Sequence, residues 1–540
     1  MKLQPQTQVL LWAAIAAVVV VAVCFANSLP NDFIVDDYRI VALNPAIRTI
    51  APLHFFKTPY WGENSHAGLY RPLTIFSFSL EYPWWRRWAG GYRLTNLLLH
   101  AINGFLVLLL ARSLFQSIPA AWAASALYLA HPVHTEPVVA LAGRSELLAA
   151  MFFLLAWISY RRGKTFLCSV AFFLSLLSKE NAIAFPAVIF VERVVFHGGL
   201  RNALKEWKRL GALAATALVY LGVRFWVLGE FGIPKPIQYL QGSWTITQRE
   251  LTTGRAFLKY FQLLVAPLEV TGDYDFNSIP LAAVNDWVAW AGLLLVLLTI
   301  VFAFRMLKTR PGIGFAILFF YLTILPVSNW IIPTAVILSE RALYLPSLGI
   351  CMLAGLVWAG ISNIQLRRVL GLGVMVTAAL LCVAHSYIWR NDLTYFGNLI
   401  HVFPNNVRGQ LGYGTALVEA GRAEEARQHF EAGLRVTRSA PLLVGLSEAL
   451  LQIDRSCGLA RPVLNEALSI EPADPFAPWL LAECYENDGS LLEAEASYRQ
   501  AVNNSRFPEP RLLIGWGRVL EKTGKPEEAR EAYRRAALLQ

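Results

Sequence analysis

Two adjacent aspartates, Asp36 and Asp37, are the residues of this sequence best suited to chemistry. They lie just past the first hydrophobic run, in the stretch Phe33-Ile-Val-Asp-Asp-Tyr38. Carboxylates beside a bilayer are costly, and two neighbouring carboxylates repel each other, so such a pair usually has a purpose. A carboxylate here could remove a proton from an acceptor hydroxyl as that hydroxyl attacks a sugar carbon, which is the general-base half of glycosyl transfer. The alternative is a solvated loop with a role only in topology.

Four cationic residues could assist the departure of a lipid phosphate, which leaves as a stable anion and needs cations rather than an acid: Arg71, Arg144, Lys179 and Arg341. Arg341 is favoured because a guanidinium fork matches phosphate oxygens, and the neighbouring Glu340 could hold that fork in place. The alternative for Arg341 is an interfacial arginine that anchors a helix end.

Further polar residues are candidates for contact with the sugar or the acceptor. They are His131, His134 and Glu136, in one short stretch, and Glu180, which follows Lys179. The stretch His131-Pro-Val-His-Thr-Glu136 does not have the spacing of a helical zinc motif, so hydrogen bonding to a sugar or diphosphate is favoured over metal binding. Lys179 and Glu180 could instead form a structural ion pair. No further cofactor is indicated, although a divalent cation, Mg²⁺ or Mn²⁺, at Asp36 and Asp37 stays open.

The composition indicates that most of the chain lies in a membrane. Of its 540 residues, 56% are hydrophobic and 16% are charged, and the apolar residues are gathered into runs that one soluble core could not bury. The net charge of +10 would suit a nucleic-acid partner, but Lys and Arg lie between the apolar runs rather than along one soluble face. We therefore expect membrane lipids, and no nucleic acid, as partners.

The apolar runs predict about eleven membrane-spanning helices, over about 9–28, 94–114, 119–135, 145–160, 165–178, 181–196, 210–228, 284–304, 312–330, 343–361 and 369–388. Cytoplasmic loops retain Lys and Arg, and the basic clusters all fall on one side if the amino terminus is cytoplasmic. This parity requires the run at about 255–268 to enter the outer face and leave again. The first run is expected to be an uncleaved anchor. The polar candidates then lie on the outer face.

A repeat defines the carboxy-terminal domain. Ala426, Ala460, Ala494 and Ala529 are separated by 34, 34 and 35 residues, and each is followed by a large residue after four positions and a small residue after seven. This is the tetratricopeptide spacing, in which small residues let two helices approach and the large residue fills the gap between them. The prediction is a solenoid of about four repeats that binds a partner through its concave face.

The expected protein is therefore all-α and has two domains. A polytopic membrane helix bundle occupies 1–388, a connecting segment 389–406, and the tetratricopeptide-repeat α-solenoid 407–540. Of the six cysteines, only Cys457 and Cys484 could pair outside the membrane, and the sequence leaves open whether they do.

Several motifs stand in a particular order along the chain: Asp36-Asp37 with Asn44, Tyr70-Arg-Pro-Leu-Thr74, Tyr92 to His100, His131-Pro-Val-His-Thr-Glu136 with Gly143-Arg144, Leu177-Ser-Lys-Glu180, Ser339-Glu-Arg-Ala-Leu-Tyr-Leu-Pro-Ser347, and Trp389-Arg-Asn-Asp392 to Pro404-Asn-Asn406. In this order they resemble the transmembrane and tetratricopeptide repeat-containing O-mannosyltransferases of the GT-C glycosyltransferase superfamily. The resemblance covers nearly the whole chain.

The resemblance implies a GT-C bundle with its active site on the outer face, a polyprenyl-phosphate sugar donor and a protein Ser or Thr acceptor. The donor is typically dolichyl-phosphate mannose in eukaryotic relatives. Carried onto this chain, it implies that Asp37 is the catalytic base and that Asp36 organises the acceptor or a cation. The chain has only about four repeats, where animal members have more. A eukaryotic member would lie in the endoplasmic reticulum with lumenal repeats; a prokaryotic one, which the short loops suggest, would lie in the inner membrane and use an undecaprenyl-type carrier.

Three other functions are compatible with the sequence. An inactive membrane scaffold would present the repeats to extracytoplasmic partners and would not need Asp36 or Asp37. A transporter would place its ionisable residues at mid-membrane depth, whereas here they gather at one face. A transferase acting on a glycan or lipid would share the same site, and the repeats favour a protein acceptor only mildly.

Overall fold

The computed structural model describes residues 5–62, 68–229, 245–274, 277–334, 336–454, 457–505 and 508–539. Within these residues the chain is helical and forms no strand, apart from one isolated antiparallel bridge between Tyr274 and Leu338. The chain divides into two compact units, Met1–Tyr395 and Phe396–Gln540. The predicted all-α fold class is therefore confirmed.

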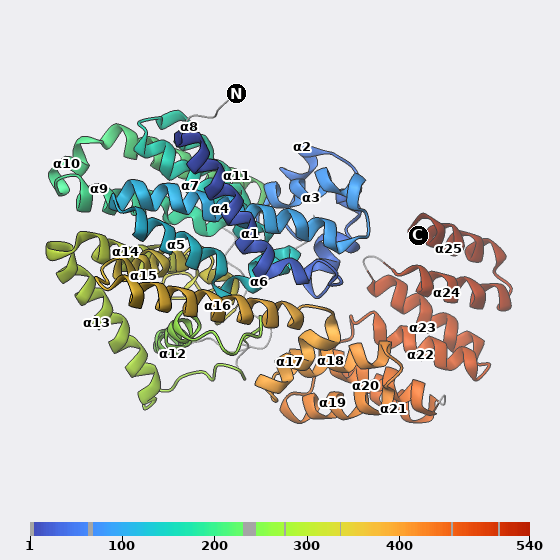
Figure 1. Cartoon of the computed structure of the whole chain (residues 1–540). Coiled ribbons are helices and arrows are strands. Elements are labelled where there is room, and N and C mark those ends of the chain that lie inside the picture. The colour runs from blue at the N-terminus through green and yellow to red at the C-terminus, as the bar shows by residue number, and fades with distance from the viewer. Residues whose placement is uncertain are drawn as a thin grey trace. The chain divides into compact units, whose positions relative to one another are not determined.

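Each predicted apolar run overlaps a helix of the first unit (Figure 1). These helices are α1 (Pro5–Phe25), α4 (Ala89–Phe115), α5 (Ile118–Ala130), α7 (Arg144–Arg161), α8 (Thr165–Ser178), α9 (Phe185–Phe196), α11 (Trp207–Leu228), α13 (Trp287–Thr309), α14 (Pro311–Ile324), α15 (Ser347–Ala359) and α16 (Ile364–Ile388). Among the described residues, six helical stretches are long and apolar enough to cross a bilayer, namely those containing α1, α4, α7, α11, α13 and α16. The total of about eleven crossings stays a prediction.

Further helices lie between these: α2 (Pro52–Phe55), α3 (Pro72–Trp85), α6 (Thr135–Val139), α10 (Leu200–Lys205) and α12 (Ile246–Val265). The run that was expected to enter and leave the outer face falls mostly on α12. This helix packs closely on α13, because Gly254 and Gly292 meet there and a Cβ atom at Gly292 would lie 2.0 Å from the Gly254 carbonyl oxygen. Small residues allow two apolar helices to approach in this way.

Local sequence signals set several helix starts. Ser117, Asp286 and Asn363 accept backbone N–H hydrogen bonds at the first turns of α5, α13 and α16. Such caps satisfy donors that the helix itself leaves unpaired. Helix α4 then packs against α1, α5 and α7, which brings the connections between these helices together.

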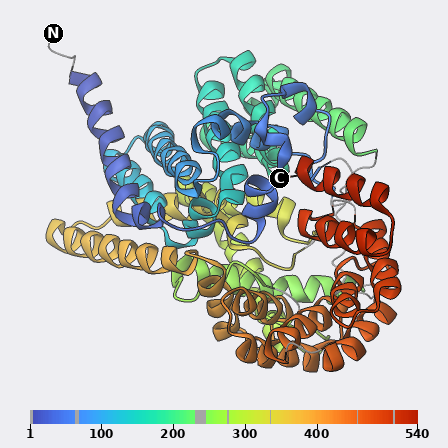
Figure 2. The ribbon, with the colours of Figure 1, turned by 90° about the vertical axis from the view of Figure 1, so that its right-hand side faces the viewer.

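The second unit is a row of antiparallel helix pairs, which follow one another in an arc coloured orange to red in Figure 2. Helix α17 (Asp392–Val402) precedes α18 (Val407–Glu419), α19 (Ala423–Val436), α20 (Ala440–Asp454), α21 (Cys457–Ile470), α22 (Phe476–Asn487), α23 (Leu491–Asn504), α24 (Pro510–Lys522) and α25 (Pro526–Leu539). The described part of this unit after α17 thus holds four pairs, as the repeat spacing predicts.

The small and large residues of the repeat act as expected. Ala426 on α19 and the Phe430 ring one turn later are fully buried. Gly414 on α18 and Gly445 on α20 both face that ring, and a Cβ atom at either position would lie 2.6 or 2.4 Å from it. The ring therefore fills a space that only glycine backbones leave open.

A disulfide joins Cys457 on α21 to Cys484 on α22, with their Cα atoms 5.4 Å apart. This answers the pairing that the sequence left open. Disulfides persist in oxidising compartments and are rare in the cytosol.

Candidate active site

The candidate residues gather at one end of the helix bundle of the first unit. Asp36 and Asp37 follow α1, Glu136 lies on α6 between α5 and α7, and Lys179 lies between α8 and α9. Arg341 lies on the short helix η9 (Glu340–Leu343) just before α15. Hydrogen bonds and ion pairs join these connections to one another, although the residues are far apart in the sequence.

Arg341 joins two carboxylates. Its Nη1 atom lies 3.3 Å from Asp36 Oδ2, and its Nε atom lies 3.5 Å from Glu136 Oε1. The Arg341 backbone N–H also donates to Glu136 Oε2 at 2.7 Å. The Arg341 side chain is 32% exposed, whereas that of Glu136 is 4% exposed. The guanidinium is therefore fixed in position and still open on one side, as a site for an anion requires.

Glu340 was expected to hold the Arg341 fork, and the structure corrects this expectation. The Glu340 carboxylate is buried and accepts hydrogen bonds from the Thr271 N–H at 2.9 Å and from the Tyr274 hydroxyl. It therefore anchors the segment after α12. Glu136, which is 205 positions from Arg341, takes the predicted role of Glu340.

Asp37 is buried, with 1% of the residue exposed. Its Oδ1 atom accepts the Ala142 N–H at 3.2 Å, while its Oδ2 atom is buried with no hydrogen-bond partner among the described residues. Burial raises the pKa of Asp37 to about 7; the Arg93 charge and the Ala142 hydrogen bond oppose this shift, and the charge of Asp36 adds to it. A carboxylate with a pKa near neutrality is well matched to general-base catalysis. Asp36 differs, since its side chain is 33% exposed and faces Arg341.

Arg93, at the start of α4, holds the segment that carries the two aspartates. Its buried guanidinium donates to the carbonyl oxygens of Val139 at 2.8 Å, Asn31 at 2.7 Å, Asp32 at 3.0 Å and Ser28 at 3.1 Å. Arg93 lies within the motif Tyr92 to His100 and was not predicted to be a site residue. A lone arginine at the start of an apolar helix was the available signal, because a buried arginine must find acceptors.

A second set of contacts fixes the aspartates from the other side. Val35, immediately before them, has φ of 46°, a left-handed conformation that is strained for a β-branched residue. Its N–H donates to Asp392 Oδ1 at 3.4 Å, and the Tyr38 hydroxyl donates to Asp392 Oδ2 at 3.1 Å. The motif after α16 thus contacts the segment that bears the candidate base.

Arg71 and Lys179 lie in a second charged group beside the first. Arg71 pairs in a bidentate manner with Glu180, through Nε to Oε2 at 2.9 Å and Nη2 to Oε1 at 2.5 Å. Lys179 pairs with the buried Glu146 on α7. Lys179 and Glu180 therefore pair with other residues rather than with each other. Burial opposes ionisation of Glu180, but Arg71 outweighs burial and holds the pKa of Glu180 below its usual range.

Arg144 is a structural arginine, in contrast to its predicted contact with phosphate. It is fully buried and donates to Glu81 Oε1 at 2.6 Å, Asn96 Oδ1 at 2.8 Å and the Tyr92 carbonyl at 2.5 Å, while its guanidinium lies over the Phe78 ring. It joins α3, α4 and α7. Because Glu81, Asn96 and the Tyr92 carbonyl accept from its guanidinium, the structure gives no support for a contact between Arg144 and a lipid phosphate.

The two histidines are also engaged within the protein. His131 Nε2 lies 3.1 Å from the Leu264 carbonyl oxygen, and its Nδ1 atom accepts the Val133 N–H at 3.3 Å. His134 contacts the Tyr128 carbonyl oxygen and the Ser347 hydroxyl, both at 2.7 Å. Both rings are buried, so the structure gives no support for the predicted contact of either ring with a sugar.

The described part of the chain contains no group of three or more His, Cys, Asp or Glu side chains placed to hold a metal ion. Asp36 and Asp37 turn to different partners, one to Arg341 and one to the Ala142 N–H. A cation held by both carboxylates would need a rearrangement of these contacts.

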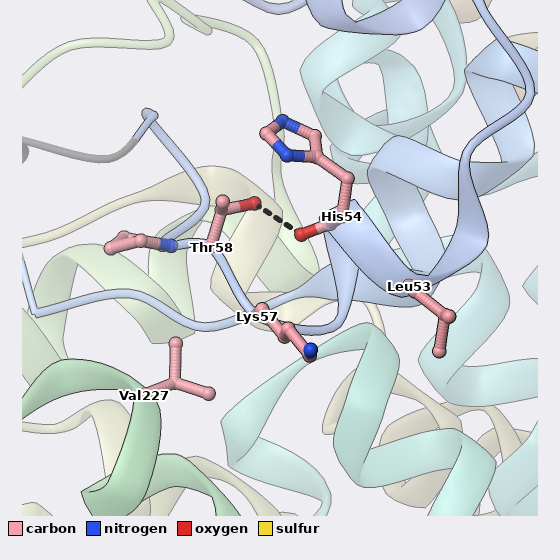
Figure 3. A pocket seen from close by; sticks show the side chains of 6 residues that line it. Leu53, His54, Lys57, Thr58 and Val227 are labelled. Carbon is pink, nitrogen blue, oxygen red and sulfur yellow. Dashed lines mark hydrogen bonds between the residues drawn. The ribbon is translucent and has the colours of Figure 1, made fainter.

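A pocket of about 450 Å³ lies beside the segment that leads to Tyr60 (Figure 3). Leu53, His54, Lys57, Thr58, Pro59 and Val227 line it. The Thr58 hydroxyl donates to the His54 carbonyl at 3.0 Å, which closes the turn in this segment. No residue predicted to act in catalysis or binding lines this pocket.

Comparison with known proteins yields matches over nearly the whole chain. Protein O-mannosyl-transferase TMTC3 of Mus musculus is 28% identical over 96% of this chain and 62% of its own length. Protein O-mannosyl-transferase TMTC4 of Mus musculus is 26% identical over 78% of this chain and 66% of its own, and Tmtc3 of Drosophila melanogaster is 26% identical over 93% and 65%. The chain resembles the TMTC protein O-mannosyl-transferases. It spans about three fifths of the length of the mouse TMTC3 relative.

A family model described as tetratricopeptide repeat matches residues 393–441. This match covers α17, α18 and α19, so repeat-like sequence begins before residue 407, where the repeats were expected to start. It supports the tetratricopeptide assignment that the spacing of the alanines predicted.

Proposed function

We propose that this protein is a membrane glycosyltransferase of the GT-C type that transfers a sugar, with mannose favoured, from a polyprenyl-phosphate donor to a Ser or Thr of a protein acceptor. The observation that carries this proposal is the juxtaposition of the buried Asp37, whose pKa burial raises to about 7, with the partly exposed pair of Asp36 and Arg341. One group can accept a proton, and the other can bind an anion. The similarity to protein O-mannosyl-transferases supports the same reaction.

In this mechanism Asp37 removes the proton from the acceptor hydroxyl. The acceptor oxygen forms a bond to the anomeric carbon from the face opposite the phosphate, and the bond from that carbon to the phosphate oxygen breaks, which inverts the configuration. The leaving prenyl phosphate takes the electron pair and departs as an anion. Arg341 is placed to bind it, while the charges of Arg71 and Lys179 are paired with Glu180 and Glu146.

Asp36 and Glu136 act as positioning residues for Arg341. Their carboxylates contact Nη1 and Nε respectively, so they fix the plane of the guanidinium and leave one side open. Such preorganisation lowers the cost of binding the charge that develops on the leaving phosphate.

The repeat domain is proposed to bind the protein acceptor and to lie outside the cytoplasm. The disulfide between Cys457 and Cys484 supports an oxidising compartment. In a eukaryotic cell this would be the lumen of the endoplasmic reticulum, with a dolichyl carrier. In a prokaryote it would be the outer side of the inner membrane, with an undecaprenyl-type carrier.

The test is transfer of radiolabelled mannose from polyprenyl-phosphate mannose to protein, in membranes that contain equal amounts of each variant. Asp37→Asn should abolish labelling and Asp36→Asn should reduce it. Asp32→Asn is the matched control, because Asp32 is an exposed aspartate on the same segment, and it should retain labelling. If the wild type transfers neither mannose nor glucose from any polyprenyl-phosphate donor, the proposal fails and an inactive scaffold becomes the better interpretation.

A further inference from the structure

Tyr60 places a buried hydroxyl beside the candidate active site, in the segment between α2 and α3. The residue is 5% exposed, and its Oη atom has no hydrogen-bond partner within the described ranges. Its backbone N–H donates to the Leu69 carbonyl at 2.9 Å, and its ring packs in the cluster that includes Phe78 and Ala142. The position of the ring is thus fixed by packing, while its hydroxyl is unpaired. A buried hydroxyl without a partner is costly, so such groups call for an explanation.

The charges around Tyr60 identify the kind of ligand. The Arg71 guanidinium lies 5.3 Å from the centre of the Tyr60 ring. The positive charges of Arg71 and Arg341 lower the pKa of the Tyr60 phenol, and the negative charges of Asp36 and Asp37 raise it. The phenol is therefore beside Arg71 and within electrostatic range of Arg341, Asp36 and Asp37. Asp37 Oδ2 is likewise buried without a hydrogen-bond partner among the described residues.

We propose that the Tyr60 hydroxyl donates a hydrogen bond to a phosphate oxygen of the lipid donor, beside Arg71 and Arg341. This inference rests on the proposed function and deepens it by assigning an uncharged contact to the phosphate. Burial raises the pKa of Tyr60 above its ordinary value, so the phenol stays protonated and acts as a donor rather than as a base. An added phosphate oxygen is the acceptor that this hydroxyl lacks, and a neutral donor adds a directed contact without further repulsion between the two arginines.

The inference is tested on the purified full chain in lipid nanodiscs, with citronellyl phosphate as a short prenyl phosphate and citronellol as its phosphate-free counterpart. Tyr60→Phe removes the hydroxyl and retains the ring. It should raise the Kd for citronellyl phosphate about tenfold, the loss expected for one hydrogen bond to a charged group, and leave binding of citronellol unchanged. Tyr160→Phe is the matched control, because the Tyr160 hydroxyl donates to Glu206 at 2.7 Å, away from the candidate residues. It should leave both affinities unchanged.

Parallel assays of sugar transfer separate this inference from the proposed function. A Tyr60→Phe variant that binds citronellyl phosphate as tightly as the wild type overturns the inference, whatever its transfer rate. An unchanged Kd with a raised KM for the acceptor peptide would assign the hydroxyl to the acceptor instead. If the wild type binds the phosphate but transfers no sugar, the proposed function fails, and the role of Tyr60 is judged by the shift in Kd alone. Absence of binding by the wild type refutes the inference.

Discussion

The rate of sugar transfer should rise with pH across neutrality, because Asp37 must be deprotonated to act as the base. An ordinary aspartate has a pKa of 3.8, and burial raises that of Asp37 to about 7. With this value about nine tenths of the carboxylate is ionised at about pH 8 and about one tenth at about pH 6, so kcat/KM for the acceptor should fall about tenfold between them. An aspartate with an unshifted pKa would be ionised at both values and would give a flat profile.

Two neighbouring carboxylates provide variants that assign the ionisation. The negative charge of Asp36 raises the pKa of Asp37, so Asp36→Asn should move the midpoint of the pH profile to lower pH. Loss of the contact with Arg341 should at the same time lower the overall rate. Burial also raises the pKa of Glu136, to about 8, so Glu136 titrates in the same window and the measured midpoints belong to the coupled group. Glu136→Gln keeps an oxygen that can accept the Arg341 N–H and removes this second ionisation.

The assay is the initial rate of mannose transfer to a Ser/Thr peptide at subsaturating peptide, at constant ionic strength, with purified full chain. Each sample is returned to about pH 8 and assayed again, so that loss of fold is distinguished from protonation. The pH profile of Glu136→Gln should still rise with a midpoint near pH 7. A flat wild-type profile would refute the assignment of the base, and a profile that becomes flat in Glu136→Gln would assign the rise to Glu136.

Two further predictions concern the framework. Arg144→Gln should lower the free energy of unfolding by about 3–5 kcal/mol, because it leaves Glu81 without its cationic partner. The melting temperature of the purified protein measures this loss, with Arg87→Gln, at an exposed arginine, as the control. Equal melting temperatures for Arg144→Gln and the wild type would contradict the structural role of Arg144. The paired Cys457→Ser and Cys484→Ser variant should destabilise the repeats by about 3 kcal/mol. In the wild type both thiols should resist maleimide-polyethylene glycol until reduction, and labelling of both without reductant would show that the disulfide does not form.

The site shows how far local sequence information reaches. Asp36 and Asp37 could be singled out because their charge and their position after an apolar run are both visible in the sequence. Their different environments were not visible: Asp37 is buried against the Ala142 N–H, while Asp36 faces Arg341. The pKa of Asp37 depends on burial and on a hydrogen bond from a segment more than 100 positions away in the sequence.

Charged side chains that look alike in the sequence divide into separate roles in the structure. Arg144 and Arg341 both follow polar motifs at the ends of apolar runs, but packing buries Arg144 among α3, α4 and α7 and leaves Arg341 partly open. Glu340 adjoins Arg341 in the sequence, yet its side chain points to Thr271 while Glu136 makes the contact. Adjacency along the chain does not determine the direction of a side chain.

The sequence by itself determined the helical runs and the period of the repeats, because hydrophobicity and residue size act on each segment locally and recur at fixed spacing. Ala426 with Phe430 illustrates this, since their spacing alone predicted the close helix pair that is observed. Tertiary structure alone decided that Cys457 pairs with Cys484, that Arg93 holds the aspartate segment, and that the Tyr60 hydroxyl is buried without a partner among the described residues. These features depend on which surfaces meet when the helices pack, and this packing depends on contacts between segments that are distant in the sequence.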